Sequence, residues 1–145
     1  MKTQVLPITP ESVELAAKLL QQGELVALPT ETVYGIAADA RNGEAVKKIF
    51  EAKGRPQDNP LIVHIYGMAA AFWPGPLTMV MPRGPEVSDV TCAGLDTVGV
   101  RMPSHPVVQQ VIRESGVAFA APSANLSGKP SPTNAPDTLA DMDGR

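Results

Sequence analysis

Three polar segments of the sequence combine hydroxyl, amide or cationic side chains with Gly or Pro, and each lies next to a predicted strand. They are Pro-Thr-Glu-Thr-Val-Tyr-Gly at residues 29–35, Lys-Gly-Arg-Pro-Gln-Asp-Asn-Pro at residues 53–60, and Pro-Ser-Ala-Asn-Leu-Ser-Gly-Lys-Pro-Ser at residues 122–131. Polar loops at strand ends are where α/β sheets usually bind ligands. Each segment also has a plainer interpretation, as a turn or surface loop whose side chains bond to the nearby backbone.

The second segment favours anion binding most clearly. Between residues 41 and 58, five basic residues outnumber three acidic ones, a local surplus of +2. Lys53 is accounted for by its place at a predicted helix C-terminus, where a cation favours the helix dipole. Arg55 is not, because it lies beyond Gly54 on a Pro-containing loop, where a planar guanidinium suits phosphate or carboxylate recognition.

Several familiar kinds of site are disfavoured. Gly128-Lys129 lacks the preceding Gly and the following Ser or Thr of a phosphate-binding loop, and no strand is followed by a dinucleotide-binding fingerprint. There is no Gly-x-Ser-x-Gly elbow, which disfavours covalent hydrolase chemistry. His64 lies within an apolar strand pattern, where a lone histidine is more often a hydrogen-bonded core residue than a catalyst.

The segments are positioned by alternating helices and strands. Helices are predicted from Pro10 with Thr9 as the cap and Gly23 as the stop, over residues 44–53 with Gly54 as the stop, and after a Ser104 cap with Gly116 as the stop. Strands are predicted at residues 25–28, 61–65, 77–81, 97–101 and 117–121. Strands interleaved with helices indicate a layered α/β domain.

Length and composition limit the classes of protein that the chain can represent. At 145 residues with 43% hydrophobic residues it fits a single globular domain. One cysteine, Cys92, and two histidines cannot form an internal disulfide or a structural zinc cluster. There is no signal-like or membrane-spanning apolar run, so we expect a cytoplasmic protein that does not contact a membrane. A net charge of -3 disfavours a wholly basic RNA-coating surface.

Together the polar segments resemble the YrdC-like family, the threonylcarbamoyl-AMP synthases. The matching residues are the motif at 29–35, Lys53-x-Arg55, Phe-Trp-Pro-Gly-Pro-Leu-Thr at 72–78, Val-Arg-Met-Pro at 100–103, and Ser123-x-Asn125. One such match would be weak, but five in the family's order are highly specific. The resemblance implies an α/β fold with a twisted, mostly mixed open sheet, flanked by helices, and a concave basic cleft.

The resemblance also implies a reaction. L-threonine, bicarbonate and ATP would give threonylcarbamoyl-AMP and pyrophosphate, and the adenylate would serve N6-threonylcarbamoyladenosine modification of tRNA. A nucleotidyltransferase of this kind implies Mg²⁺ accompanying ATP and downstream tRNA threonylcarbamoyltransferase proteins as partners. A contact with tRNA or double-stranded RNA is implied as well.

Carried over position by position, the resemblance assigns two groups of residues. Threonine would meet Thr32, His64, Arg101 and the backbone near Ala121. ATP would meet Lys53, Arg55, Asn59, Thr97, Ser123, Asn125 and Ser131. Lys53 and Arg55 would be the catalytic residues, because they offset the repulsion between anionic reactants without acting as nucleophiles. The Arg101 assignment is physically sensible, since a guanidinium can hold a carboxylate through two parallel hydrogen bonds.

Two departures from the family pattern shape the expected domain. The stretch before the Trp73 motif is shorter than usual, and the sequence ends early at Arg145. We therefore expect one YrdC-like domain, residues 1–145, lacking a segment near 68–69 and a C-terminal part. Two alternatives stay open: a protein that binds RNA or a nucleotide without synthesis, and a carbamoyl-transfer domain like that of hydrogenase-maturation proteins.

Overall fold

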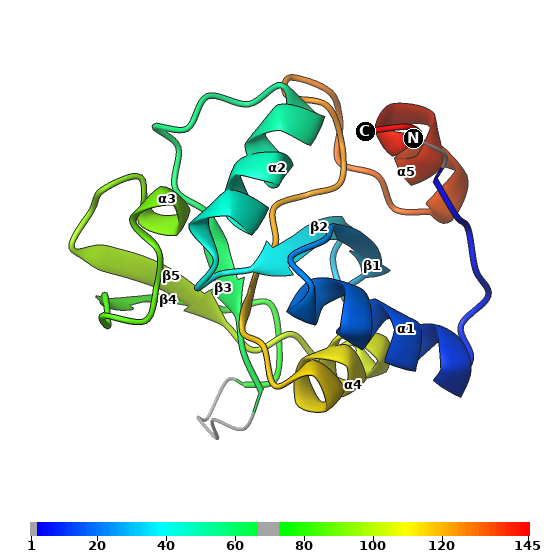
Figure 1. Ribbon diagram of the computed structural model, residues 1–145, viewed down its shortest axis with the longest axis horizontal. Coiled ribbons are helices and arrows are strands. Elements are labelled where there is room, and N and C mark those ends of the chain that lie inside the picture. Colours follow the sequence, from blue (N-terminus) through cyan, green and yellow to red (C-terminus); the bar gives the residue numbers. More distant parts are fainter. Residues whose placement is uncertain (1–2, 67–72) are drawn as a thin grey trace.

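The computed structural model describes residues 3–66 and 73–145 as an open six-stranded sheet with helices on both faces (Figure 1). The elements are α1 (Pro10–Gln21), β1 (Val26–Pro29), β2 (Tyr34–Asp39), α2 (Gly43–Lys53), β3 (Ile62–His64), β4 (Thr78–Pro82), α3 (Asp89–Cys92), β5 (Thr97–Arg101), α4 (Pro106–Ser115), β6 (Phe119–Ala120) and α5 (Ala135–Met142). The strand order is β1-β2-β6-β3-β5-β4. β3 and β5 are parallel and the other neighbouring pairs are antiparallel, which confirms the predicted mixed open sheet.

The two faces of the sheet pack against different helices. Because side chains alternate along a strand, Val63, Val98 and Val100 share one face, and they join the hydrophobic core formed with α2 and α3. On the other face, Ala37 and Phe119 pack with the apolar stripes of α1 and α4. Figure 1 shows α2 on the opposite side of the sheet from α1 and α4.

The half of the second face formed by β3, β5 and β4 stays partly exposed. The register pairs Arg101 with both His64 and Thr78, which puts these three side chains on the same face. Thr97 alternates onto that face too and is exposed, and Val80 on edge strand β4 exposes 74% of its surface. This half-face is therefore available to a ligand, although whether it forms a concave basic cleft stays a prediction.

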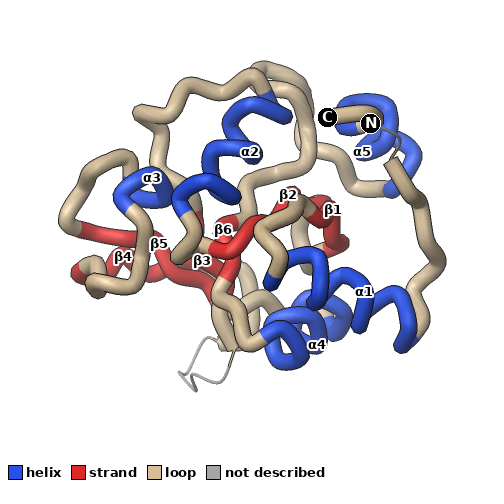
Figure 2. Tube along the Cα trace, in the orientation of Figure 1, coloured by secondary structure: helices blue, strands red, loops and turns tan. Residues whose placement is uncertain are grey.

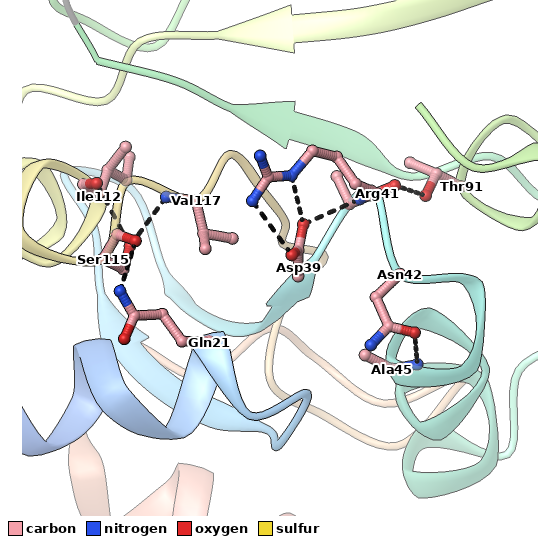
Figure 3. A network of polar contacts seen from close by, with 10 residues as sticks. Gln21, Asp39, Arg41, Asn42, Ala45, Thr91, Ile112, Ser115 and Val117 are labelled. Atoms are coloured by element: carbon pink, nitrogen blue, oxygen red, sulfur yellow. Dashed lines mark hydrogen bonds and ion pairs between the residues drawn. The ribbon is translucent and has the colours of Figure 1, made fainter. Parts of the chain in front are cut away.

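The helix boundaries follow from local chemistry. Thr9 and Ser12 form a capping box at the start of α1, and Asn42 Oδ1 accepts the backbone N–H groups of Glu44 and Ala45 at the start of α2 (Figure 3). Gly54 ends α2 in the left-handed conformation, with φ 59°. The Thr9 cap and the Gly54 stop were predicted, whereas the Asn42 cap was not, and α2 begins one residue before the predicted start at residue 44.

A side-chain hydrogen bond joins the two helices of the second face. Gln21 Nε2 at the end of α1 donates to the carbonyl of Ser115 at the end of α4 at 2.8 Å (Figure 3). The Ser115 hydroxyl in turn accepts the N–H of Val117 at 3.2 Å, which satisfies a buried donor as the chain leaves α4 for β6. The hydrogen bond thereby joins α1 to α4, and both helices pack on the sheet through the second hydrophobic cluster.

Some sequence-based predictions of elements were wrong or incomplete. Ser104 is not the cap of α4: His105 occupies that position, and the Ser104 N–H donates instead to Glu31 Oε2 at 3.2 Å. β2, α3 and α5 were not predicted, and the strand predicted at 117–121 forms a ladder only at Phe119–Ala120. The segment expected to be short near 68–69 lies outside the described residues, so that expectation stays a prediction.

Long loops connect α2 to β3 and β6 to α5, and they carry two of the three polar segments (Figure 2). The two ends of the described chain lie together beside α5 (Figure 1), where the Gly144 N–H donates to Thr3 Oγ1 at 2.9 Å. Among residues 3–66 and 73–145, no helix has both the length and the apolar composition needed to span a membrane.

Candidate functional site

The first and third polar segments run side by side. Gly35 and Ser123 form an isolated antiparallel bridge, within which the Ala124 N–H donates to the Tyr34 carbonyl at 2.7 Å. The Ile36 N–H donates to the Pro122 carbonyl at 2.9 Å. β2 is therefore extended along the loop that follows β6, and the 29–35 motif is joined to the Ser123-x-Asn125 motif.

Lys53 joins the second segment to the third. Its Nζ donates to the carbonyl of Asn125 at 2.6 Å and also to that of Ser123, while the N–H of Ser127 donates back to the Lys53 carbonyl at 2.8 Å. In Figure 1 the segment after β6 passes the C-terminal end of α2. All three polar segments thus meet at one place, as the family resemblance implies.

The Lys53 ammonium is buried, with 2% of the residue exposed. Burial, and then the positive charge of Arg55, lower the pKa of Lys53 to about 8, and Asp141 opposes the shift. At neutral pH the group is still mostly protonated. An ammonium has three donors, and two of them are used by the carbonyls, so one is left to face a ligand.

Arg55 lies immediately after the Gly54 cap and is half-buried. Its Nη2 approaches the carbonyls of Asn59 and Pro60 at 3.4 Å each, at the long limit of a hydrogen bond. Within the described part of the chain its buried Nε has no partner. Burial lowers the pKa of this guanidinium. It is a loosely held cation with unused donors, which is what recognition of a phosphate requires.

Asn125 shapes the loop of the third segment from inside. The residue is 6% exposed, and its Nδ2 donates to the carbonyls of Leu126 at 2.9 Å and Lys129 at 2.8 Å. Its Oδ1 is buried and, among the residues that the structure describes, has no partner. Ser123 is half-buried, and Asn59 and Ser131 are exposed on the same two loops.

His64 lies at the end of β3 and is 3% exposed. Its ring centroid is 5.8 Å from that of Phe119, its partner on β6, so the interpretation as a core histidine is correct as far as burial goes. Burial, and then the positive charge of Arg101, lowers the pKa of His64 to about 3, so the imidazole is neutral. Its Nδ1 is buried without a partner in the described chain, which leaves one polar atom for a ligand.

Arg101 is the register partner of His64 on β5. Its Nε donates to Thr78 Oγ1 at 3.0 Å, which fixes the guanidinium on the partly exposed half-face. The Ala121 N–H already donates to the Ile62 carbonyl at 3.0 Å, so any contact of the Ala121 backbone with a ligand must use other atoms. Thr97 lies at the opposite end of β5, about 13 Å from Arg101 at the usual rise of a strand.

Thr32 lies in the turn between β1 and β2 and is exposed. The turn is built by Thr30, whose Oγ1 accepts the N–H groups of Thr32 and Val33 at 3.2 Å each and donates to the Val33 carbonyl at 2.7 Å. The plainer interpretation of this motif is therefore correct for Thr30. The Thr32 hydroxyl contacts Thr30 Oγ1 at 3.1 Å and remains accessible. β6 separates β2 from β3, so Thr32 and His64 do not lie on neighbouring strands.

Sequence reasoning missed two acidic residues at this site. Glu31 accepts the Ser104 N–H, and Asp141 on α5 contacts the loop of the third segment. Neither contact has a local sequence signal, because the partners are far apart in the chain. The helix that carries Asp141 does have one, since Asn134 with Asp137 three residues later is a typical N-terminal cap.

The described residues contain no group of three or more His, Cys, Asp or Glu side chains that could hold a metal ion. Two surface hollows have volumes of about 510 and 340 Å³. The first is lined by residues 83–85 and 87–89, the second by residues that follow β3 and by the end of α4 and the segment after it, and neither lining includes a predicted substrate residue.

Comparison with known proteins agrees with this arrangement. The sequence profile of the Sua5/YciO/YrdC family, described as "Telomere recombination", matches residues 18–71 and 64–145. The threonylcarbamoyl-AMP synthase of Bacillus subtilis is 53% identical over 148 residues, covering 90% of this chain and 43% of the relative. That of Pyrococcus abyssi is 49% identical over 150 residues, covering 92% and 44%.

A crystal structure of P. abyssi Sua5 complexed with L-threonine superposes with a TM-score of 0.88 at 47% identity, covering 94% of this chain and 45% of that one. The chain thus spans less than half the length of these relatives. The matched range of the family profile includes every strand of the sheet and all three polar segments.

Proposed function

The chain belongs to the Sua5/YciO/YrdC family, and from that premise we propose that it provides the synthase site of an L-threonylcarbamoyladenylate synthase. The substrates are L-threonine, bicarbonate and ATP, and the products are threonylcarbamoyl-AMP and pyrophosphate. The reaction class is nucleotidyl transfer. Support comes from relatives named threonylcarbamoyl-AMP synthase that are 53% and 49% identical.

The observation that carries the proposal is the junction made by Lys53. This residue joins two loops through the carbonyls of Ser123 and Asn125, and around it Arg55 Nε and Asn125 Oδ1 are buried without partners in the described chain. A buried polar atom without a partner costs about 1 to 3 kcal/mol, so a ligand that satisfies both atoms binds with that advantage. Phosphate oxygens suit Arg55, and a ribose hydroxyl or adenine amino group suits the Asn125 oxygen.

Threonine fits the partly exposed half-face. Arg101 would hold the carboxylate, since its Nε is fixed by Thr78 and its other donors can form a parallel pair. A neutral His64 can exchange a hydrogen bond with the threonine hydroxyl, as can the accessible Thr32 hydroxyl if substrate bridges the distance between them. That P. abyssi Sua5 was crystallised with L-threonine supports an amino-acid site in this fold.

The chemistry follows from charge. The threonine amine adds to the bicarbonate carbon and water leaves, which gives a carbamate. A carbamate oxygen then attacks the α-phosphorus, and the bond to the leaving pyrophosphate breaks. In the phosphoryl step the carbamate and the triphosphate are both anions, so repulsion between them is the main barrier. Lys53 and Arg55 lower it by placing two partly desolvated positive charges on the nucleotide side. Magnesium bound to the phosphates would add charge of the same sign.

The product has a defined destination in this proposal. A mixed anhydride of a carbamate and AMP is a reactive acyl donor, so a tRNA threonylcarbamoyltransferase is the expected consumer, in the cytoplasm. A direct contact with tRNA or double-stranded RNA belongs to the same hypothesis. No observation on the described residues favours the alternatives of nucleotide binding alone or of carbamoyl transfer.

The test is to incubate the chain with ATP, bicarbonate and threonine and to measure pyrophosphate release together with the adenylate by mass spectrometry. We expect both products in equal amounts, with serine weaker than threonine and valine weaker still, because a site that reads a hydroxyl rejects a substrate that lacks one. ATP binding without either product would support the binding alternative. Valine performing as well as serine would rule out hydroxyl recognition by Thr32 and His64.

A further inference from the structure

Helix α5 is firmly attached to the body of the protein. Asn134 Oδ1 accepts the Asp137 N–H at 2.9 Å at the start of the helix, and Thr138 and Met142 are buried. Met142 belongs to the same hydrophobic core as α2. A side chain on the last turn of α5 therefore projects from a fixed support.

Asp141 is that side chain, and it exposes only 12% of its surface. Oδ2 accepts the N–H of Leu126 at 3.2 Å, and Oδ1 accepts from Lys129 Nζ at 2.6 Å. The Lys129 bond is the main reason that the pKa of Asp141 is lowered, so the carboxylate is charged at neutral pH. One carboxylate thus holds both ends of the turn that runs from Leu126 to Lys129.

The same turn is held from inside by a residue of the proposed ATP site. Asn125 Nδ2 donates to the carbonyls of Leu126 and Lys129, the two residues whose N–H and ammonium groups Asp141 binds. Next in the chain, the Ser127 N–H donates to the Lys53 carbonyl at 2.8 Å. One short stretch, residues 126–129, is therefore hydrogen-bonded by three residues: Asp141, Asn125 and Lys53.

From this geometry we propose that Asp141 is a positioning residue for the nucleotide side of the site. It fixes the Leu126–Lys129 turn and so sets the orientation of Asn125, whose Oδ1 is left to face the nucleotide. The proposal rests on the proposed function for the identity of the ligand. We do not expect Asp141 to affect threonine binding, because Arg101 and His64 are held by the sheet register and by Thr78.

The test compares three single variants of the whole chain. Asp141→Ala removes both bonds, and Asp141→Asn keeps an acceptor for the Leu126 N–H but removes the ion pair. Asp143→Asn is the matched control, because it removes the same charge two residues away, where the carboxylate contacts only the Thr3 N–H in the described chain. For each variant, calorimetry gives the dissociation constants for ATP and for L-threonine, and hydrogen exchange gives the protection of each backbone amide.

We expect Asp141→Ala to weaken ATP binding by about tenfold, the loss of one well-formed charged contact, with threonine affinity changed by less than about twofold. Asp141→Asn should lie between Asp141→Ala and the unchanged chain, and Asp143→Asn should match the unchanged chain. Amide exchange in Asp141→Ala should speed up at Leu126 and Ser127 and stay unchanged in α1 and α4.

Two results would overturn the proposal. If Asp141→Ala and Asp143→Asn bind ATP with equal affinity, Asp141 has no link to the nucleotide. If Asp141→Ala loses affinity for ATP and for L-threonine equally, and amide exchange is faster across the sheet, Asp141 only stabilises the fold. If the unchanged chain binds no ATP, the proposed function fails separately. The exchange data then decide alone, and unaltered protection of Leu126 would show that Asp141 does not hold the turn.

Discussion

Replacing His64 tests whether the imidazole in the proposed threonine site is uncharged in the folded protein. Burial beside Arg101 lowers the pKa of this histidine from 6.5 to about 3. The unfolded chain titrates near the ordinary value and the folded chain far below it, so between these values the unfolded state binds more protons. His64 therefore does not reduce the free energy of unfolding above about pH 6.5. The free energy of unfolding decreases as the pH falls from there toward the pKa of His64 in the folded chain.

The size of the effect follows from the two pKa values. A histidine that titrates at 6.5 in the unfolded chain and at about 3 in the folded chain loses about 2 kcal/mol of stability between pH 7 and pH 5. His64→Gln keeps a polar side chain of similar length that does not titrate in this range. The carboxylates of the protein are common to both forms, so their contribution cancels in the difference.

The assay is urea unfolding at pH 7 and pH 5, followed by the fluorescence of Trp73, the single tryptophan, which is buried. The unchanged chain should lose about 2 kcal/mol more than His64→Gln over this pH interval. His105→Gln, which removes the other histidine, should behave like the unchanged chain. Equal losses in the unchanged chain and in His64→Gln would show that His64 is not held neutral, and the argument for its role would fail.

Two further substitutions separate the two sides of the site. Arg55→Ala should lower ATP-dependent turnover by about a hundredfold. The melting temperature should change little, because the contacts of Arg55 with the carbonyls of Asn59 and Pro60 are long. A large loss of melting temperature with normal turnover would contradict this. Thr32→Val should weaken threonine by about 1 to 3 kcal/mol and leave ATP unchanged, whereas Thr30→Val, which removes the bonds of the turn, should lower thermal stability. Unchanged threonine affinity in Thr32→Val would remove that residue from the site.

Much of the fold was predictable because its helix boundaries are set locally. Thr9 caps a helix within three residues of itself, and Gly54 and Gly116 adopt positive φ where a helix must end. β2 was missed because its first residues belong to the 29–35 motif, whose hydroxyl groups and glycine indicate a turn. α3 has four residues, too few for any periodicity to be read.

The site was less predictable from the residues alone, because it depends on contacts between distant segments. The bridge of Gly35 with Ser123 and the bonds from Lys53 to the following loop are set by strand order and register, which no local pattern specifies. The family resemblance supplied the grouping that spacing could not. Even so, it assigned only groups expected to contact substrate, and so it passed over Asp141, which contacts Leu126 and Lys129 of the loop.

Burial lowers the pKa of both buried bases, but it leaves Lys53 charged and His64 neutral at neutral pH. These two charge states suit the two proposed substrates. Burial lowers the pKa of Lys53 only to about 8, so that group stays cationic at neutral pH where polyanionic ATP is proposed to bind. It lowers that of His64 to about 3, which keeps the imidazole uncharged beside Arg101. A cationic His64 would compete with Arg101 for the threonine carboxylate and would lose the ability to accept a hydrogen bond from the hydroxyl. In the proposed site, with His64 neutral, Arg101 would hold the carboxylate of threonine and the imidazole would bind its hydroxyl. Burial would then serve charge neutralisation at Lys53 and selectivity at His64.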